Sequence, residues 1–107
     1  IDNSILGKYF QMGTGRSKGY FRVKKDLKDM ITFERFNLMN QFSSDFNFDV
    51  IFCRNVMIYF DKYTQSRLVD KYYNSLKKDG YFFVGHSESL TGLTHSFKYI
   101  EPSVYQK

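Results

Sequence analysis

The sequence has 107 residues, of which 42% are hydrophobic and 20% aromatic, and it carries a net charge of +5. This composition excludes an intrinsically disordered chain and allows one domain with a hydrophobic core. No apolar run approaches the roughly 20 residues that a membrane-spanning helix needs. The single cysteine, Cys53, excludes an internal disulfide framework and indicates a reducing compartment. We therefore expect a cytoplasmic protein without membrane insertion. Because the first residue is Ile1 rather than Met, we also expect a shortened form of a longer protein.

The positive charge favours an acidic partner, which leaves nucleic acid, an anionic membrane and an acidic protein segment open. The basic residues are scattered along the chain, and no cluster of them alternates with aromatic residues on one strand face. A solvated positive surface is the simpler interpretation. We predict that the protein does not bind nucleic acid.

The first third of the chain predicts a weak helix followed by a small antiparallel hairpin. Residues 1–11 have weak helical spacing, and the glycines within 13–19 are followed by an aromatic and β-branched run. This order is typical of a turn inside a hairpin. We assign residues 9–25 to a β-hairpin subdomain and predict a further strand over 31–36.

The second half predicts a strand, a helix and a second strand. Residues 50–53 are continuously apolar, as expected for a strand buried on both faces, and residues 64–78 have helical spacing. Asp61 or Thr64 can cap this helix, and Gly80 is its predicted C-terminal stop. The apolar residues that follow Gly80 predict a second strand, and a strand–helix–strand unit of this length makes the two strands parallel.

The tail predicts a hairpin at the sheet edge, with Pro102 in its turn. In open α/β sheets, ligands bind outside the carboxyl ends of the strands. Polar residues follow three predicted strand ends, namely Asn37, Arg54-Asn55 and His86-Ser87-Glu88. The sequence therefore predicts a ligand site on one rim of the sheet.

Four other patterns are better explained by structure than by chemistry. Gly13-Thr14-Gly15 with Gly19 lacks the preceding strand, following helix and lysine position of a phosphate loop. His86, Ser87 and Glu88 are adjacent in sequence, so they do not form a hydrolase triad. His86 and His95 lack the further ligands of a metal site, and we predict no metal. Cys53 at the end of an apolar strand is interpreted as a packed thiol.

Residues 48–61 read FDVIFCRNVMIYFD, and this run resembles the signature of the chemotaxis receptor glutamate methyltransferases, the CheR type. Further matches keep the order of that family along essentially the whole chain. They are Tyr9-Phe10, Gly13-Thr14-Gly15, Phe36-Asn37-Leu38, Leu76-Lys77-Lys78-Asp79-Gly80-Tyr81, Gly85-His86-Ser87-Glu88-Ser89 and Val104-Tyr105. The resemblance implies an α/β fold in which residues 1–107 are the C-terminal half of a doubly wound catalytic domain with a small hairpin subdomain.

The resemblance also implies S-adenosylmethionine as the cofactor and the cytoplasmic helices of chemotaxis receptors as partners, with methyl transfer to their glutamates. Carried onto matching positions, Asn37, Leu38, Arg54 and Asn55 would contact the cofactor. Tyr59 would lie near the transferred methyl group and steer the incoming carboxylate as the catalytic residue.

The hairpin resembles the family's small subdomain, which in some members binds a receptor peptide as an added strand. Gly13, Gly15 and Arg22 match this subdomain, whereas Met12 stands where the peptide-binding members carry an arginine.

In the family's sheet, two strands that this chain does not contain separate residues 31–35 from residues 50–53. The resemblance therefore implies a fragment that is inactive alone, with an open strand edge available for an edge-paired or strand-exchanged dimer. Two alternatives remain: a non-catalytic module that binds a receptor or partner, and half of a nucleotide-binding domain from another α/β enzyme.

Overall fold

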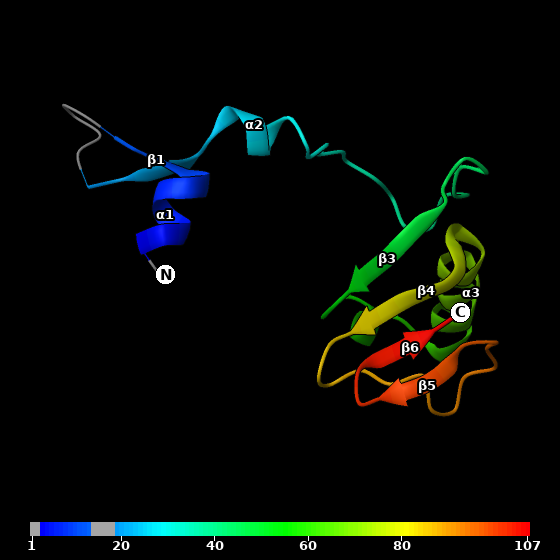
Figure 1. Cartoon of the computed structure of the whole chain (residues 1–107). Coiled ribbons are helices and arrows are strands. Elements are labelled where there is room, and N and C mark those ends of the chain that lie inside the picture. Colours follow the sequence, from blue (N-terminus) through cyan, green and yellow to red (C-terminus); the bar gives the residue numbers. More distant parts are fainter. Residues whose placement is uncertain (1–2, 14–18) are drawn as a thin grey trace. The chain divides into compact units, whose positions relative to one another are not determined.

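The computed structural model describes residues 3–13 and 19–107 (Figure 1). The chain divides into two compact units, Ile1–Arg35 and Phe36–Lys107. Each unit has its own secondary structure and is described by itself below.

The first unit consists of a short helix and a two-stranded hairpin. Its elements are α1 (Asn3–Tyr9), β1 (Phe10–Met12), β2 (Phe21–Val23) and α2 (Lys25–Lys28). β1 and β2 pair antiparallel, with Phe10 opposite Val23 and Met12 opposite Phe21. Lys24 ties the hairpin to α1, because its Nζ donates a hydrogen bond to the Gly7 carbonyl at 2.9 Å. The predicted helix and hairpin are confirmed, and residues 14–18 of the predicted turn lie outside the described residues.

The strand predicted over 31–36 is wrong. These residues have no regular secondary structure, and Phe33 is 89% exposed. A strand needs a neighbour to receive its backbone hydrogen bonds, and no described strand pairs with this segment. Its apolar residues alone do not make it a strand.

The second unit is a four-stranded mixed sheet with one long helix. Its elements are β3 (Phe48–Cys53), the 3₁₀ helix η2 (Met57–Tyr59), α3 (Lys62–Ser75), β4 (Leu76–Val84), β5 (Lys98–Glu101) and β6 (Val104–Gln106). The strand order is β3-β4-β6-β5, with β3 and β4 parallel and the other pairs antiparallel. The predicted parallel pair and the tail hairpin around Pro102 are confirmed. β3 ends the sheet, so the expected open edge is present.

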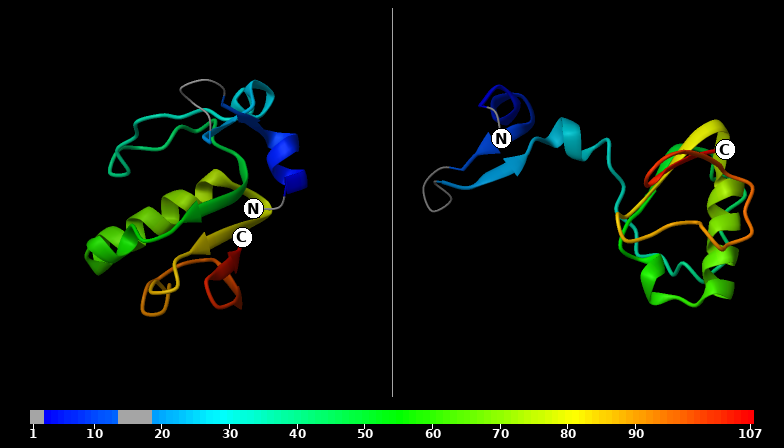
Figure 2. Two further views of the ribbon diagram at one scale, coloured as in Figure 1. Left: turned by 90° about the vertical axis from the view of Figure 1, so that its left-hand side faces the viewer. Right: turned by 90° about the horizontal axis from the view of Figure 1, so that it is seen from below.

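α3 packs on one face of this sheet, which lies in front of the helix in Figure 1. Leu68, Val69 and Tyr72 of α3 are buried against Phe82 and Val84 of β4, and none of these five side chains is more than 5% exposed. Figure 2 shows the helix running along β3 and β4. The apolar stripe predicted for the helix is therefore what fixes it on the sheet.

The opposite face of the sheet, here called the open face, consists of Val50 and Phe52 of β3 with Tyr81 and Phe83 of β4. Val50 lies opposite Tyr81 and Phe52 opposite Phe83, and the two phenylalanine rings stack with centroids 4.7 Å apart. Phe52 is nevertheless 69% exposed. The prediction that this strand is buried on both faces is thus wrong for the chain, because no other α-helix lies in residues 36–107 to cover the second face. The structure shows a mixed α/β unit, and the doubly wound arrangement stays a prediction.

The predicted end of α3 is also wrong. The helix ends at Ser75, and Gly80 lies within β4 rather than at a helix C-terminus. Leu76 is extended (φ −93°, ψ 146°) and only 2% exposed, so burial of its side chain beside β3 directs the chain into the strand. A Cβ at Gly80 would lie 3.0 Å from the Asp49 carbonyl oxygen, so this glycine permits close packing of β4 on β3.

Candidate functional site

The ends of β3 and β4 lie against each other at the carboxyl end of the parallel pair. Arg54 and Asn55 follow β3 and are both exposed, and Asn55 has a left-handed backbone with φ 60°. Gly85 follows β4, and a Cβ there would come within 2.8 Å of Asn55 Oδ1. A larger residue at position 85 would force the Asn55 side chain to move, so glycine here allows the two strand ends to lie in direct contact.

The buried carboxylate of Glu88 joins these two ends. Its side chain is 7% exposed. One oxygen accepts the backbone N–H groups of Asn55 at 2.6 Å and Gly85 at 3.0 Å, and the other accepts the N–H of Ile58 at 3.2 Å. Glu88 therefore holds the loop after β3 against the loop after β4.

The turn η2 is held from its other side by α3. The side-chain amide of Gln65 donates hydrogen bonds to the carbonyls of Met57 at 2.7 Å and Phe60 at 2.9 Å. Met57 is buried at 2% exposure, whereas Tyr59 is 80% exposed. The phenol of Tyr59 is thus exposed to solvent on a turn whose backbone is held by these contacts.

The segment that carries Asn37 and Leu38 is bound to α3. Asn37 Oδ1 accepts the N–H of Met39 at 2.9 Å. The ammonium of Lys71 donates to the carbonyls of Leu38, Met39 and Asn40 at 3.1, 3.2 and 3.0 Å. Leu38 also packs on the core. One helix cation therefore fixes the backbone of the predicted cofactor-contacting segment.

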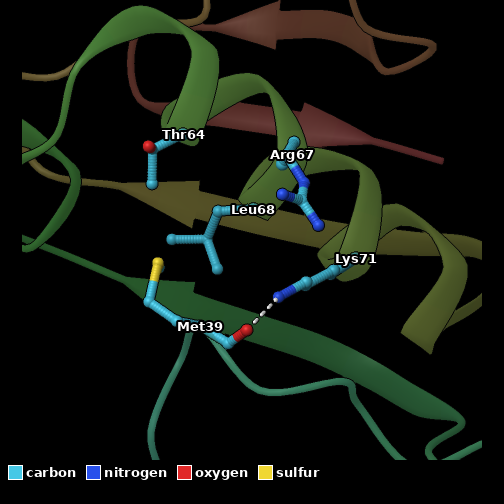
Figure 3. Close-up of a pocket in the computed structure, with 5 residues that line it drawn as sticks. All are labelled: Met39, Thr64, Arg67, Leu68 and Lys71. Carbon is cyan, nitrogen blue, oxygen red and sulfur yellow. Dashed lines mark hydrogen bonds between the residues drawn. The ribbon is translucent and has the colours of Figure 1, made fainter.

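A small cavity of about 100 Å³ lies between this segment and the first turns of α3 (Figure 3). It is lined by two apolar side chains, Met39 and Leu68, and by three polar ones, Thr64, Arg67 and Lys71. A second hollow of about 410 Å³ adjoins Glu88 at the carboxyl end of β4.

The structure brings Arg54, Asn55 and Tyr59 together on one loop. Asn37 and Leu38 lie on a separate segment of the same unit, and no hydrogen bond joins Asn37 to Arg54 or Asn55 within residues 36–107. That both segments face one cofactor stays a prediction.

The hairpin residues belong to the first unit. The Gly13 N–H donates to the Tyr20 carbonyl at 2.8 Å, which closes the described part of the hairpin. Arg22 is exposed on β2 opposite Gln11. Gly15 lies outside the described residues.

Cys53 is a packed thiol at the end of β3. It is 5% exposed, and the hydroxyl of Tyr72 donates a hydrogen bond to its sulfur at 3.0 Å. Burial raises the pKa of the Cys53 thiol, and the Glu88 charge raises it further, against the opposing effect of the Tyr72 hydrogen bond. Burial likewise raises the pKa of Tyr72 above its usual range.

Residues with metal-binding side chains do not gather in the described part of the chain, where no group of three or more His, Cys, Asp or Glu residues could hold an ion. His95 Nδ1 accepts the N–H of Phe97 at 3.1 Å, which gives this histidine a structural contact. Among the described residues, no helix is long and apolar enough to cross a membrane.

Sequence reasoning did not find the contacts by which three residues organise the site: Glu88, Gln65 and Lys71. Glu88 was predicted as one of the polar residues after the strand ends, but its contact with the loop after β3 was not. The sequence signal for this contact was the position of Glu88 three residues after the glycine at the end of β4. An acidic side chain at that position can accept hydrogen bonds from the free N–H groups of neighbouring loops. Gln65 and Lys71 gave no signal, since polar residues on a helix are usually solvated.

Comparison with known proteins identifies the family of the chain. Residues 1–106 match the family model described as CheR methyltransferase, SAM binding domain. A chemotaxis protein methyltransferase from Borreliella burgdorferi is 48% identical over 88 residues, covering 81% of this chain and 31% of the relative. Relatives of the same description from Salmonella typhimurium and Escherichia coli are 43% and 42% identical over 101 residues, covering 94% of this chain and 35% of each relative. The chain thus spans about one third of the length of these curated relatives. It belongs to the CheR family of S-adenosylmethionine-binding methyltransferases.

Proposed function

We propose that this chain is the C-terminal part of the catalytic domain of a protein-glutamate O-methyltransferase that modifies chemotaxis receptors in the cytoplasm. The observation that carries the proposal is the loop after β3, where Arg54, Asn55 and the exposed Tyr59 stand at the carboxyl end of two parallel strands. This is the edge at which open α/β sheets bind ligands.

The residues present fit part of S-adenosylmethionine, the cofactor of the family. Arg54 is an exposed cation suited to the amino-acid carboxylate of this molecule, and the amides of Asn37 and Asn55 suit its hydrogen-bonding groups. The absence of a side chain at Gly85 leaves the loops after β3 and β4 in contact, so Arg54 and Asn55 stand directly beside the end of β4. In this assignment Asn37 and Leu38 hold the adenine end, and Arg54 and Asn55 hold the remainder.

Methyl transfer to a glutamate requires few catalytic groups from the chain itself. S-adenosylmethionine supplies, when bound, an electrophilic methyl group on a cationic sulfur. A glutamate side chain, with a pKa of about 4.3, is ionised at neutral pH, so none of the chain's residues has to remove a proton. The role left to Tyr59 is orientation: its hydroxyl donates a hydrogen bond to one oxygen of the incoming carboxylate and directs the other towards the methyl group.

Tyr59→Phe tests this role in a form of the protein extended upstream to the length of its relatives. We expect methyl transfer to fall on the order of tenfold, because one oriented hydrogen bond to a charged group is lost. Tyr63→Phe is the matched control, since Tyr63 is also an exposed tyrosine, at 71%, four residues further along. Full turnover in Tyr59→Phe removes the hydroxyl from the mechanism.

The isolated chain is proposed to be inactive, because it spans about one third of its relatives and offers only part of a cofactor site. Titration of S-adenosylhomocysteine into this chain and into the extended form tests the assignment. Tight binding by the extended form alone supports the methyltransferase. Binding by neither form supports the alternative, a module that contacts a receptor without catalysis.

The partners proposed are the cytoplasmic helices of chemotaxis receptors, with the net charge of +5 suited to acidic segments around the modified glutamates. Gly13, Gly15 and Arg22 of the hairpin are proposed to contact the receptor. Met12, which is 63% exposed, occupies the position of the arginine found in peptide-binding members. Met12→Arg is therefore expected to strengthen binding of an acidic C-terminal receptor peptide, measured by calorimetry.

The open edge of β3 is proposed to pair with a second copy of the chain when the residues of the longer protein are absent. Sedimentation of the chain and of the extended form tests this. We expect the short chain to dimerise with rising concentration and the extended form to remain monomeric. A monomeric short chain at all concentrations contradicts the proposal.

A further inference from the structure

We propose that Glu88 is a positioning residue that holds the cofactor-binding and substrate-binding loop in its active conformation, an inference that rests on the proposed function. The loop is the one that carries Arg54, Asn55 and Tyr59 after β3. Glu88 lies on the loop after β4 and acts on these residues only through their backbone.

The contacts of Glu88 enclose this loop at two points. Its carboxylate accepts the N–H of Asn55 at 2.6 Å and the N–H of Ile58 at 3.2 Å. The two hydrogen bonds therefore fix both ends of the segment 55–58. The third bond, from the Gly85 N–H at 3.0 Å, joins the carboxylate to the end of β4. Moving this one side chain would therefore release the loop from the end of β4, while Gln65 would still hold η2 on α3.

The carboxylate is held by backbone dipoles rather than by a cation. Glu88 is 7% exposed, and the ion pair found among the described residues joins Lys77 to Asp49 instead. A buried charge without a counterion needs hydrogen bonds to replace its lost hydration. The three N–H groups supply these bonds, so the loop conformation and the buried charge stabilise each other.

Two features of the backbone are explained by this arrangement. Asn55 adopts φ 60°, a conformation that few residues other than glycine populate, and there its N–H reaches Glu88. A Cβ at Gly85 would lie 2.8 Å from Glu88 Oε1 as well as from Asn55 Oδ1. Glycine at position 85 thus makes room for the carboxylate to reach both loops.

The test replaces Glu88 by glutamine, which keeps the shape and one acceptor oxygen but turns a donor towards a backbone N–H. Glu101→Gln is the matched control, because Glu101 is exposed on β5 and loses the same charge. In the extended form we expect Glu88→Gln to weaken S-adenosylhomocysteine binding about 10- to 100-fold and to lower kcat as well, since the loop also carries Tyr59. Glu101→Gln should bind like the unmodified protein.

The outcomes separate this inference from the proposed function. If the unmodified extended protein does not bind S-adenosylhomocysteine, the proposed function fails and the inference fails with it. If that protein binds but Glu88→Gln binds equally well, only the inference is overturned. A measurement on the unmodified 107-residue chain covers the case in which Glu88→Gln does not fold. NMR should detect scalar coupling between the Asn55 amide nitrogen and the Glu88 carboxylate carbon, and its absence overturns the inference.

Discussion

The two faces of the β3–β4 pair are built from neighbouring residues of the same strands, yet they have opposite environments. Phe82 points towards α3 and has no exposed surface, whereas Phe52 points away from it and is 69% exposed. Both faces are apolar, so the difference does not come from residue type. It comes from the presence of α3 on one face, while residues 36–107 place no second α-helix on the other.

This contrast indicates that the apolar open face is suited to being covered by a further layer. Apolar side chains on both faces of a strand are typical of a parallel sheet covered by two layers of helices. The second unit supplies one of these layers, and the chain covers about one third of its relatives. A large exposed apolar patch on a sheet marks a surface that another segment or protein covers. The open face is therefore expected to become part of a core in a form extended to the length of the relatives.

The largest effect on stability is expected from removing an aromatic ring from the face covered by α3, and the same change on the open face serves for comparison. Phe82→Ala should lower the free energy of unfolding by about 3–5 kcal/mol, because it leaves a cavity under α3. Phe52→Ala should lower it by about 1 kcal/mol or less, since it loses mainly the stacking with Phe83. Urea denaturation of both variants measures the difference.

The same pair sharpens the contrast in the extended protein. There Phe52→Ala should become nearly as destabilising as Phe82→Ala, if residues of the longer protein cover the open face. Equal effects of the two variants in the short chain would break the comparison, because they would show that Phe52 is already buried in solution.

A smaller loss of stability is expected from replacing Lys71, which attaches the segment that carries Leu38 to α3. Lys71→Met keeps the aliphatic stem but removes the ammonium that contacts three carbonyls. The free energy of unfolding should fall by about 1–2 kcal/mol, because those carbonyls lose a charged donor. Lys78→Met, at an exposed position of β4, is the control. A loss of equal size in both variants would show that charge in general, and not this contact, is responsible.

Thiol labelling compares the two faces by chemical reactivity instead of stability. Cys53 faces α3, and burial raises the pKa of its thiol. Its alkylation at pH 8 should be on the order of a hundredfold slower than that of a cysteine placed on the open face by Phe52→Cys in a Cys53→Ala background. Similar rates would contradict the burial of Cys53.

The raised pKa of Cys53 also predicts a dependence of stability on pH. In the unfolded chain the thiol loses its proton near its ordinary pKa of 9.0, while in the folded chain it keeps the proton to higher pH. The folded state then binds more protons, so stability should fall as the pH rises above 9. Cys53→Ala should remove this contribution, although Tyr72 adds a decrease of the same sign at still higher pH.

Most of the second unit could be predicted from the sequence, because its periodicity is local. The stripe of Leu68, Val69 and Tyr72 and the apolar run of β4 are sufficient to predict a helix between two parallel strands. The family signature then identified Arg54, Asn55 and Tyr59 as one loop at the strand end.

The errors arose where tertiary contacts decide the structure. Residues 31–36 have strand composition but no described partner, and Leu76 leaves the helix because its side chain is buried beside β3. The contacts of Glu88 and Lys71 were not predicted because both act on backbone groups about 30 residues away, Glu88 on residues 55 and 58 and Lys71 on residues 38–40. Side-chain contacts of this kind have no periodic signature, whereas the covered face and its helix do.

The smallest effect is expected at Asp61, the residue that begins the helix of the covered face. Its carboxylate accepts the Thr64 N–H at 2.8 Å, and this bond lowers the pKa of Asp61 below its usual value of 3.8. The stabilisation is therefore present above pH 3.8 and is lost as the pH falls through the lower pKa of the folded state. Asp61→Ala should lower the melting temperature at pH 7 by roughly 2–6 °C, because the N-cap is removed. Asp61→Asn should keep most of the cap and lose the acid dependence, so an equal decrease for both variants would assign the effect to charge at the helix N-terminus and not to the hydrogen bond.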